Sequence, residues 1–219
     1  MLGRLICLVG IMALFVSENA VADILAQNTS FTNATIGVGF SDGQSVTTPA
    51  GGPWHNIQFN FEQCATPSGT SCLSTSTNTP FALGNLFLLS QIYDGLPSAL
   101  NNATPGFIAE ATTITGGVWI FASNVTLSPG TQYFFYMDTA FNGPEILYST
   151  ANPYAGGQTF EANSGNGTTY GPDDPILANV DHAFTLAGTP TTSPEPDTTL
   201  LLGSGLAGVA GLIRRKPLR

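Results

Sequence analysis

The sequence predicts an all-β protein, a single antiparallel β-sandwich of jelly-roll type. Charged residues make up only 9% of the chain, whereas 25 glycines and 15 prolines interrupt it. Amphipathic helices usually carry Lys, Glu and Arg on their exposed faces, so this composition favours short strands joined by turns. Runs of aromatic and aliphatic residues do alternate with Gly- and Pro-rich segments. The length of 219 residues suits one domain with a substantial core.

The clearest predicted strand is NIQFNFE at residues 56–62. Ile57, Phe59 and Phe61 alternate with polar residues there, which predicts one face in the core and the other in water. Denser aromatic and aliphatic runs predict strands buried on both faces, at residues 84–93, 116–122 and 131–138. Two further segments predict the outer strands of the sandwich, at residues 34–40 and 182–188.

Turns and irregular segments separate these strands. Motifs rich in Gly, Pro, Asp and Asn predict turns at SDGQ (41–44), TPAGGP (48–53), LSPG (127–130), FNGP (141–144) and YGPDDP (170–175). Residues 66–80 are polar and low in complexity, which predicts a loop, and residues 148–174 predict a second irregular region. GTPTTS at 188–193 predicts an extended linker after the domain.

The first residues have the three parts of a secretory signal peptide. Arg4 supplies positive charge, Leu5 to Val16 form an apolar run, and Ala20 and Ala22 are the small residues of a cleavage site. The run is shorter than the roughly 20 residues that span a bilayer, so an uncleaved anchor is the less favoured alternative. We therefore expect cleavage after Ala22.

This cleavage removes Cys7 and leaves Cys64 and Cys72, an even number in an oxidising compartment. The intervening ATPSGTS is turn-forming, and closing so short a loop stabilises a fold by about 2.5 kcal/mol in the chain-entropy model. A reactive or metal-binding thiol pair is the alternative, but this spacing matches no common zinc site. The sequence therefore predicts a disulfide between Cys64 and Cys72.

Positive charge is confined to the terminal segments, in Arg4, Arg214, Arg215, Lys216 and Arg219. All 14 acidic residues except Glu18 and Asp197 lie between Asp23 and Pro196, so this body carries twelve carboxylates and a formal charge of −12. Such a surface repels phosphates, which excludes nucleic acid as a partner. Without ordinary salt bridges, stability has to come from apolar burial, backbone hydrogen bonds and bound cations.

The sequence names no catalytic residue. The two histidines are His55 and His182, and no Gly-x-Ser-x-Gly motif accompanies them. In a strand, Asp181 and His182 would point to opposite faces, so they do not form a base and its orienting carboxylate. We interpret both histidines as surface or core-edge residues. Two carboxylates could still converge for glycoside cleavage, but no local motif supports an enzyme.

Calcium is the one cofactor that the sequence suggests. Asp173 and Asp174 lie in the GPDDP turn, and together with Asp181 they could offer oxygen ligands. Their spacing does not match an EF-hand loop, and a solvated turn is the favoured interpretation.

Trp54 is the best candidate for an exposed ring that stacks on a sugar, because Gly51, Gly52 and Pro53 place it in a turn. The favoured alternative is that its ring plugs one end of the sandwich. Most of the other candidate aromatics are expected in the core, namely Trp119, Tyr93, Tyr133, Tyr136, Tyr154 and Tyr170.

The tail contains an apolar run from Leu200 to Ile213, about 21 Å long as a helix, against a hydrocarbon core of roughly 30 Å. This predicts a short transmembrane helix that inserts marginally. Arg214, Arg215 and Lys216 favour a cytoplasmic C-terminus and leave the body outside the cytoplasm.

Pro194, Glu195 and Pro196, followed by this apolar run and the basic cluster, resemble the PEP-CTERM sorting signal of exported bacterial proteins. Asp197 departs from the Ser or Thr that usually follows the second proline. The resemblance implies recognition by an exosortase, a membrane cysteine transpeptidase, and delivery to the surface or matrix of a Gram-negative bacterium that makes exopolysaccharide. An unprocessed membrane anchor is the alternative.

The body resembles the β-rich choice-of-anchor domains in NLFLLSQIYDGLPSAL (85–100), VTLSPGTQYFFYMD (125–138) and DHAFTLAGTP (181–190). These domains have no assigned activity, so this resemblance implies a fold alone. The predicted organisation is a signal peptide at 1–22, a sandwich at 23–188, a linker at 189–193 and a sorting segment at 194–219.

Taken together, these features predict a non-catalytic surface or extracellular-matrix protein. Its expected partners are an exosortase, the membrane for as long as the tail remains, and exopolysaccharide. Two alternatives are a carbohydrate-binding module that uses exposed aromatics and calcium, and a secreted glycan-active enzyme.

Overall fold

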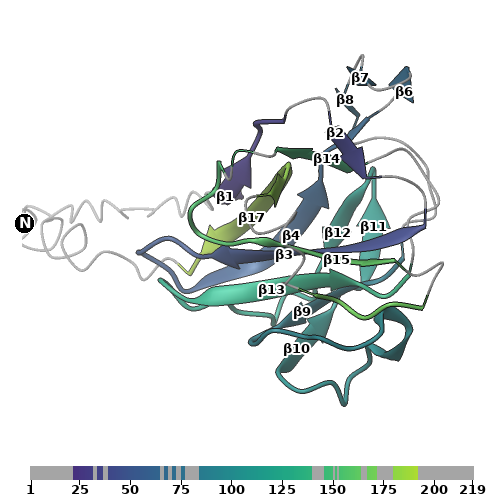
Figure 1. Ribbon diagram of the computed structural model, residues 1–219. Helices are drawn as coiled ribbons and strands as arrows, with labels where there is room; N and C mark the ends of the chain where they lie inside the picture. The colour runs from purple at the N-terminus through teal and green to yellow at the C-terminus, as the bar shows by residue number, and fades with distance from the viewer. Residues whose placement is uncertain are drawn as a thin grey trace, which may run out of the picture.

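The computed structural model describes residues 22–31, 34–36, 39–64, 67–68, 71–72, 75–76, 84–139, 146–149, 151, 153–163, 167–171 and 180–191 (Figure 1). Within these ranges the regular elements are β-strands and one 3-10 helix, η1 (Pro97–Ala99). The predicted all-β fold is therefore confirmed.

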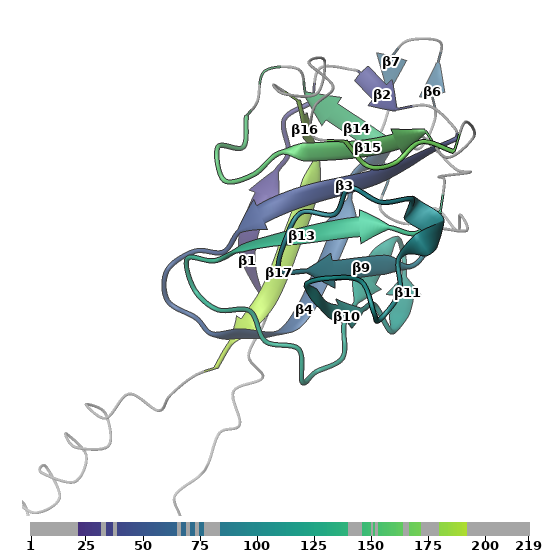
Figure 2. The same ribbon diagram turned by 60° about the horizontal axis from the view of Figure 1, so that its bottom comes forward.

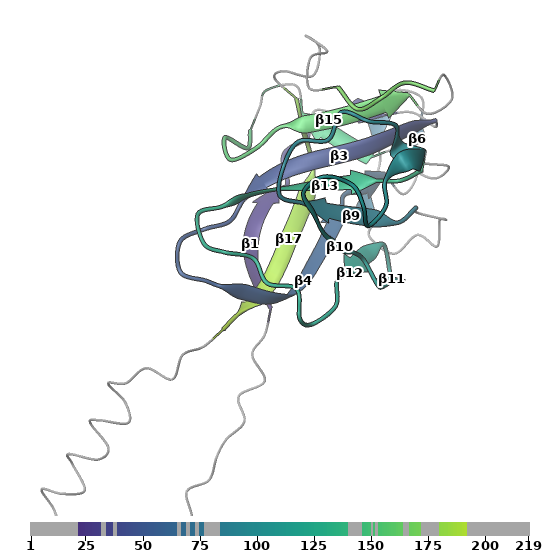
Figure 3. The same cartoon turned by 90° about the horizontal axis from the view of Figure 1, so that it is seen from below.

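Two five-stranded antiparallel sheets form the sandwich. In spatial order, sheet 1 consists of β1 (Asp23–Asn28), β17 (Phe184–Pro190), β4 (Trp54–Phe61), β12 (Val118–Ile120) and β11 (Thr113–Thr115). Sheet 2 consists of β10 (Phe107–Glu110), β9 (Leu86–Leu89), β13 (Gln132–Met137), β3 (Phe40–Thr47) and β15 (Thr159–Asn163). The two sheets lie one over the other with their strands crossing steeply (Figures 2 and 3).

Smaller sheets cover one end of the sandwich. Sheet 3 consists of β16 (Asp181–His182), β14 (Ile146–Ser149), β5 (Gln63–Cys64) and β8 (Thr75–Ser76), with β2 (Ala34–Ile36) also paired to β14. A separate two-stranded sheet consists of β6 (Pro67–Ser68) and β7 (Ser71–Cys72). β2, β6, β7, β8 and β14 lie toward the top of the view in Figure 1.

The main core fills the space between sheets 1 and 2. The Phe59 ring of β4 stacks on the Phe135 ring of β13, with centroids 4.4 Å apart. Ile57, Phe59 and Phe61 are all fully buried, as their alternation predicts. Aromatic rings supply much of this core, which fits a body without ion pairs between Lys or Arg and carboxylates.

A second apolar cluster covers the outer face of sheet 2. Tyr136 and Phe160 point away from the main core, and the Tyr170 ring packs on Tyr136 with centroids 4.7 Å apart. The loop after β9 adds Tyr93, whose backbone N–H donates to the Tyr136 hydroxyl over 3.1 Å. The predicted strand at 84–93 is therefore shorter than expected: it ends at Leu89, and the rest of the segment belongs to this covering loop.

The turn predicted at residues 41–44 is wrong, because SDGQ lies inside β3. Tertiary packing overrides its turn propensity: β13 and β15 pair with the two edges of β3, and residues 41–46 are buried. Gly43 suits this position because an added Cβ would lie 2.5 Å from a Tyr136 ring carbon.

Two other predictions need correction. β15 lies inside the region predicted to be irregular, where its Phe160 side chain completes the second cluster. The segment 182–188 is not an outer strand, because β17 pairs with both β1 and β4. β17 also extends to Pro190, so the first part of the predicted linker belongs to the folded body.

Candidate functional site

A buried pair of ionisable side chains joins sheet 2 to sheet 3. The Nε2 atom of His182 lies 3.5 Å from Oδ1 of Asp42, and both side chains are almost completely excluded from solvent. Within the described residues, neither side chain has a conventional hydrogen-bond partner. The Phe61 ring packs edge-on against the imidazole, with centroids 5.1 Å apart. His182 is therefore a core residue, and its predicted surface or core-edge position is wrong; His55 is half-buried.

Burial shifts the pKa values of both side chains of this pair. Desolvation lowers the pKa of His182 to about 3, although the Phe160 backbone acts in the opposite direction. Desolvation raises the pKa of Asp42 well above its usual 3.8, and the negative charge of Glu161 adds to this effect. Low-dielectric surroundings therefore disfavour both charged forms, the Asp42 carboxylate and the His182 imidazolium. With its pKa lowered to about 3, the imidazole is neutral at pH 7.

Gln44 of β3 is the centre of the hydrogen bonds around this pair. Its Nε2 donates to Asp181 Oδ1 over 3.3 Å, and its Oε1 accepts from Thr159 Oγ1 over 3.1 Å and from the His182 N–H over 3.2 Å. The Asp181 carboxylate also accepts from the Tyr154 N–H over 2.9 Å. These bonds tie β3, β15 and β16 together, so the cluster serves the fold and is closed to a substrate.

The prediction that Asp181 does not orient the neighbouring imidazole is confirmed, because its carboxylate faces Gln44 and Tyr154. Burial raises the pKa of Asp181 to about 6, while the hydrogen bonds from Tyr154 and Gln44 lower it. Asp181 was predicted as a possible calcium ligand, but hydrogen bonds within the fold already occupy its carboxylate. Asp173 and Asp174 lie outside the described residues, and no group of three potential metal-binding side chains occurs within them.

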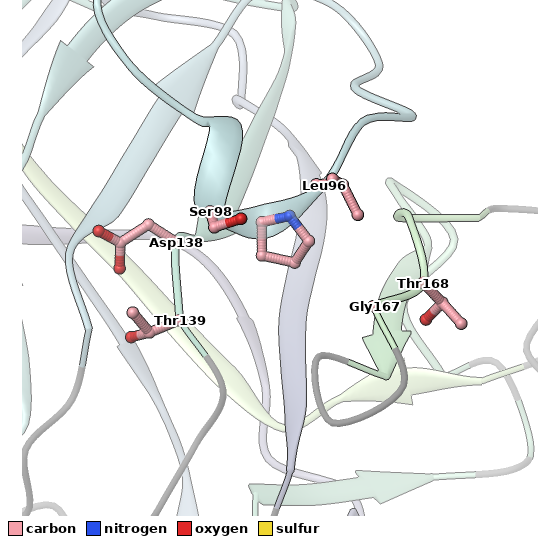
Figure 4. Close-up of a pocket in the computed structure, with 7 residues that line it drawn as sticks. Leu96, Ser98, Asp138, Thr139, Gly167 and Thr168 are labelled. Carbon is pink, nitrogen blue, oxygen red and sulfur yellow. The ribbon is translucent and has the colours of Figure 1, made fainter.

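A shallow pocket of about 220 Å³ lies beside η1 (Figure 4). Its lining consists of Leu96, Pro97, Ser98, Asp138, Thr139, Gly167 and Thr168. Asp138 is the one ionisable residue of this lining, and its carboxylate accepts hydrogen bonds from the backbone and side chain of Asn85 over 2.8 and 3.2 Å. The pocket contains no nucleophile–base pair and no aromatic ring.

Trp54 is buried, with 8% of its surface exposed, so the predicted sugar-stacking ring is wrong and the alternative of a plugged sandwich end is correct. The indole lies over Gly52, where an added Cβ would be 2.4 Å from its Nε1 atom. The other aromatics considered for stacking are buried or half-buried: Trp119, Tyr93, Tyr133, Tyr136, Tyr154 and Tyr170. A stacking platform built from these rings is therefore absent.

Cys64 is a fully buried, disulfide-bonded residue in β5. Cys72 lies in β7, and its side chain is outside the described part of the structure. The pairing of Cys64 with Cys72 thus stays a prediction.

Breaking this predicted disulfide by the double change Cys64→Ser and Cys72→Ser should lower the free energy of unfolding by about 2 to 3 kcal/mol, because the unfolded chain regains loop entropy. Urea unfolding followed by tryptophan fluorescence measures the change. Ser71→Ala with Ser74→Ala is the control for polar changes in the same loop. If reduction lowers the free energy of unfolding of the wild-type protein by the same amount, the pairing is supported. An unaltered free energy of unfolding in the double variant contradicts the pairing.

The first and last described residues lie at the same end of the sandwich (Figures 1 and 3). Asp23 pairs with Gly188, so the predicted cleavage after Ala22 falls immediately before β1. At the other terminus, Thr191 donates from its N–H and its Oγ1 to the Pro53 carbonyl, over 2.9 and 3.0 Å. The fold therefore holds the chain as far as Thr191. Ala20 and everything after Thr191 lie outside the described residues.

Comparison with known families locates the functional signal after the folded body. Residues 194–216 match the PEP-CTERM protein-sorting motif. The match contains the Pro194-Glu195-Pro196 triplet and the basic cluster of Arg214, Arg215 and Lys216. No curated protein and no solved structure is detectably similar to the chain, and the likeness of the body to choice-of-anchor domains stays a prediction.

In the described part of the chain, no helix has the length and apolar character needed to cross a membrane; the predicted helix at 200–213 lies outside that part. The match to the sorting motif is thus the finding that indicates what the tail does. The chain carries a PEP-CTERM sorting motif, which implies an exported, membrane-passing precursor that an exosortase processes and that reaches the cell surface.

Proposed function

We propose that this chain is a non-catalytic protein of the surface or extracellular matrix of a Gram-negative bacterium. An exosortase delivers it by acting on the segment 194–216, after a signal peptidase has removed residues 1–22. The observation that carries the proposal is the PEP-CTERM match. Exopolysaccharide is the proposed matrix partner.

The geometry of the body supports tail removal. β17 lies between β1 and β4, and the last backbone hydrogen bond of the described chain is made by Thr191. Because the sorting motif starts only at Pro194, a cut within it would leave every strand of the sandwich intact. The mature protein would then contain no Lys or Arg, since all five lie in the two removed segments.

The described residues also support a role without catalysis. The closest pair of a histidine and a carboxylate is His182 with Asp42, and both side chains are excluded from solvent. The carbohydrate-binding alternative depended on an exposed Trp54, which is buried. A structural or adhesive role needs neither an accessible base nor a stacking platform.

Glu195→Ala should abolish sorting, because it removes the one carboxylate of the Pro-Glu-Pro triplet. Wild-type protein from the surface fraction should lack Arg214 to Arg219 by intact-mass spectrometry. The variant should instead accumulate in the membrane fraction with these residues present. Deleting the exosortase should have the same effect on the wild-type chain.

Glu110→Ala is the matched control, because it removes an exposed carboxylate from the body and changes the net charge equally. It should be sorted like the wild type. A surface protein that retains Arg219, or normal sorting of Glu195→Ala, contradicts the proposal and favours a simple membrane anchor. Recovery of the mature protein with purified exopolysaccharide tests the matrix role separately.

A further inference from the structure

Three segments form the end of the sandwich from which the chain leaves toward the sorting motif. We call this surface the exit end and define it as residues 48–54, 127–131 and 189–191. Trp54 and Leu127 exchange two backbone hydrogen bonds of 2.9 and 2.8 Å. Thr48 Oγ1 donates to the Ser128 carbonyl over 2.6 Å. With the bonds from Thr191 to Pro53, these contacts make the exit end a well-ordered surface.

The exit end contains no ionisable side chain. Its exposed residues are small or neutral: Ala50, Gly51, Pro53, Ser128, Pro129, Gly130 and Thr191. In the described strands, the carboxylate that the pairing places nearest to the exit end is that of Asp23, which lies opposite Gly188 in β17. After the predicted cleavage, Asp23 would also carry the positive α-amino group, which offsets its charge below pH 7.7 to 8.

The remaining carboxylates of the described chain are buried or lie away from this end. Asp42 and Asp181 are buried in the cluster around Gln44. Asp138 follows the end of β13 remote from the exit end, and Glu62 follows the corresponding end of β4. Glu110 pairs with Phe87, toward that same remote end of sheet 2, and Glu161 pairs with Asp42 in the first half of β3. Asp94 follows Tyr93, whose N–H donates to the hydroxyl of Tyr136 near the remote end of β13. The fold thus separates a neutral end from a carboxylate-bearing remainder.

The connection from the exit end to the membrane run is short. Nine residues lead from Thr191 to Leu200, and an extended chain of that length spans at most about 30 Å. A precursor with the apolar run in the bilayer therefore keeps its exit end within that distance of the surface. In such a precursor the exit end is the part of the body that the chain tethers nearest to the membrane.

We propose that the exit end is the face that rests against phospholipid headgroups while the precursor awaits the exosortase. This inference rests on the proposed function, because it requires an inserted tail. The cytoplasmic-membrane surface carries anionic lipids, whose field repels carboxylates within a Debye length of about 8 Å at physiological salt. The neutral exit end can approach the membrane surface to within that distance, whereas the anionic lipids would repel the carboxylates of the opposite end.

The test uses the chain after signal removal, with its tail, in vesicles of phosphatidylcholine and phosphatidylglycerol that contain a headgroup-attached nitroxide quencher. A fluorophore is placed on Ala50→Cys, at the exit end, or on Ser98→Cys, beside η1. Protein without an added cysteine gives the labelling background. We expect loss of most of the fluorescence at Ala50 and little loss at Ser98. Equal quenching at the two positions would overturn the inference.

A label on Ser204→Cys separates this inference from the proposed function. If a water-soluble quencher reaches Ser204, the tail is not inserted and the proposed function fails. If Ser204 is protected and Ala50 is not quenched, the tail is inserted and the headgroup contact alone is refuted. Quenching at Ala50 that requires added exosortase assigns the exit end to the enzyme and also refutes the headgroup contact.

A charge variant tests the electrostatic step. Ala50→Glu with Ser128→Glu puts two carboxylates on the exit end and should weaken quenching at a Gly130→Cys label in phosphatidylglycerol vesicles. Phosphatidylcholine vesicles, or about 0.5 M salt, should restore the quenching by removing or screening the repulsion. Ser98→Glu with Thr139→Glu is the control with the same net charge. An equal effect of both pairs would contradict the orientation.

Discussion

Replacing Phe59 by Ala should lower the free energy of unfolding by about 3 to 5 kcal/mol, the range for large-to-small changes in aromatic cores. The Phe59 side chain is fully buried between the two sheets. Its ring stacks on Phe135 at 4.4 Å and meets Phe61 edge-on at 4.9 Å. Truncation would remove these contacts and leave a cavity at the point where sheet 1 meets sheet 2.

Phe31→Ala is the matched control, because 37% of the Phe31 side chain is exposed in the segment after β1. It should change stability by less than about 1 kcal/mol. Urea unfolding at one pH, followed by circular dichroism and fluorescence, measures both variants. Equal destabilisation by the two changes would contradict the position of Phe59 at the centre of the core.

The second large effect concerns pH: burial of Asp42 should make the protein lose stability as the pH rises above 3.8, and burial of His182 should make it lose stability as the pH falls below 6.5. In the unfolded chain, Asp42 titrates near 3.8 and His182 near 6.5. In the folded chain the pKa of Asp42 is raised and that of His182 is lowered to about 3. The two shifts therefore act in opposite directions: Asp42 contributes a loss of stability as the pH rises from 3.8 toward its raised folded pKa, and His182 contributes a loss as the pH falls from 6.5 toward 3.

For Asp42 the folded state binds more protons than the unfolded state above pH 3.8, and stability falls by up to about 1.4 kcal/mol per pH unit until the folded carboxyl ionises. For His182 the unfolded state binds more protons below pH 6.5, so stability falls as the pH drops toward 3. Asp181, with its pKa raised to about 6, adds a further loss as the pH rises from 3.8 to 6.

Asp42→Asn should remove the loss of stability that Asp42 contributes as the pH rises above 3.8, because an amide of similar shape has no proton to lose. Asp94→Asn, at an exposed position of the loop that covers sheet 2, should keep the wild-type slope. Urea midpoints measured at half-unit pH steps give the slopes. An unchanged slope in Asp42→Asn would show that burial does not raise the pKa of Asp42.

Local pattern was sufficient to predict strands in segments where apolar and polar residues alternate, or where apolar residues form a dense run. The alternation around Phe59 and the run TQYFFYMD are examples, and both segments contain strands at those positions. Pattern failed for β3, since SDGQ has turn propensity and becomes a strand only because β13 and β15 pair with it. It failed likewise for β17, whose position between β1 and β4 is set by partners distant in sequence.

The candidate sites divide in the same way. A sorting motif is contiguous, so Pro194, Glu195, Pro196 and the basic cluster were recognisable from the chain alone. The Asp42–His182 pair joins residues 140 positions apart, and no local signal marks such a contact. The sequence places Trp54 in a turn, but the direction in which its indole points depends on how the ring packs over Gly52.

The all-β class, the absence of Lys and Arg from the body and the sorting motif follow from the amino-acid sequence, because composition and contiguous motifs do not depend on folding. The folded structure is needed to show which strands are central, which polar groups lose water and which end of the sandwich is free of charge. Each of these depends on pairing between distant segments, and burial then raises the pKa of Asp42 and lowers that of His182.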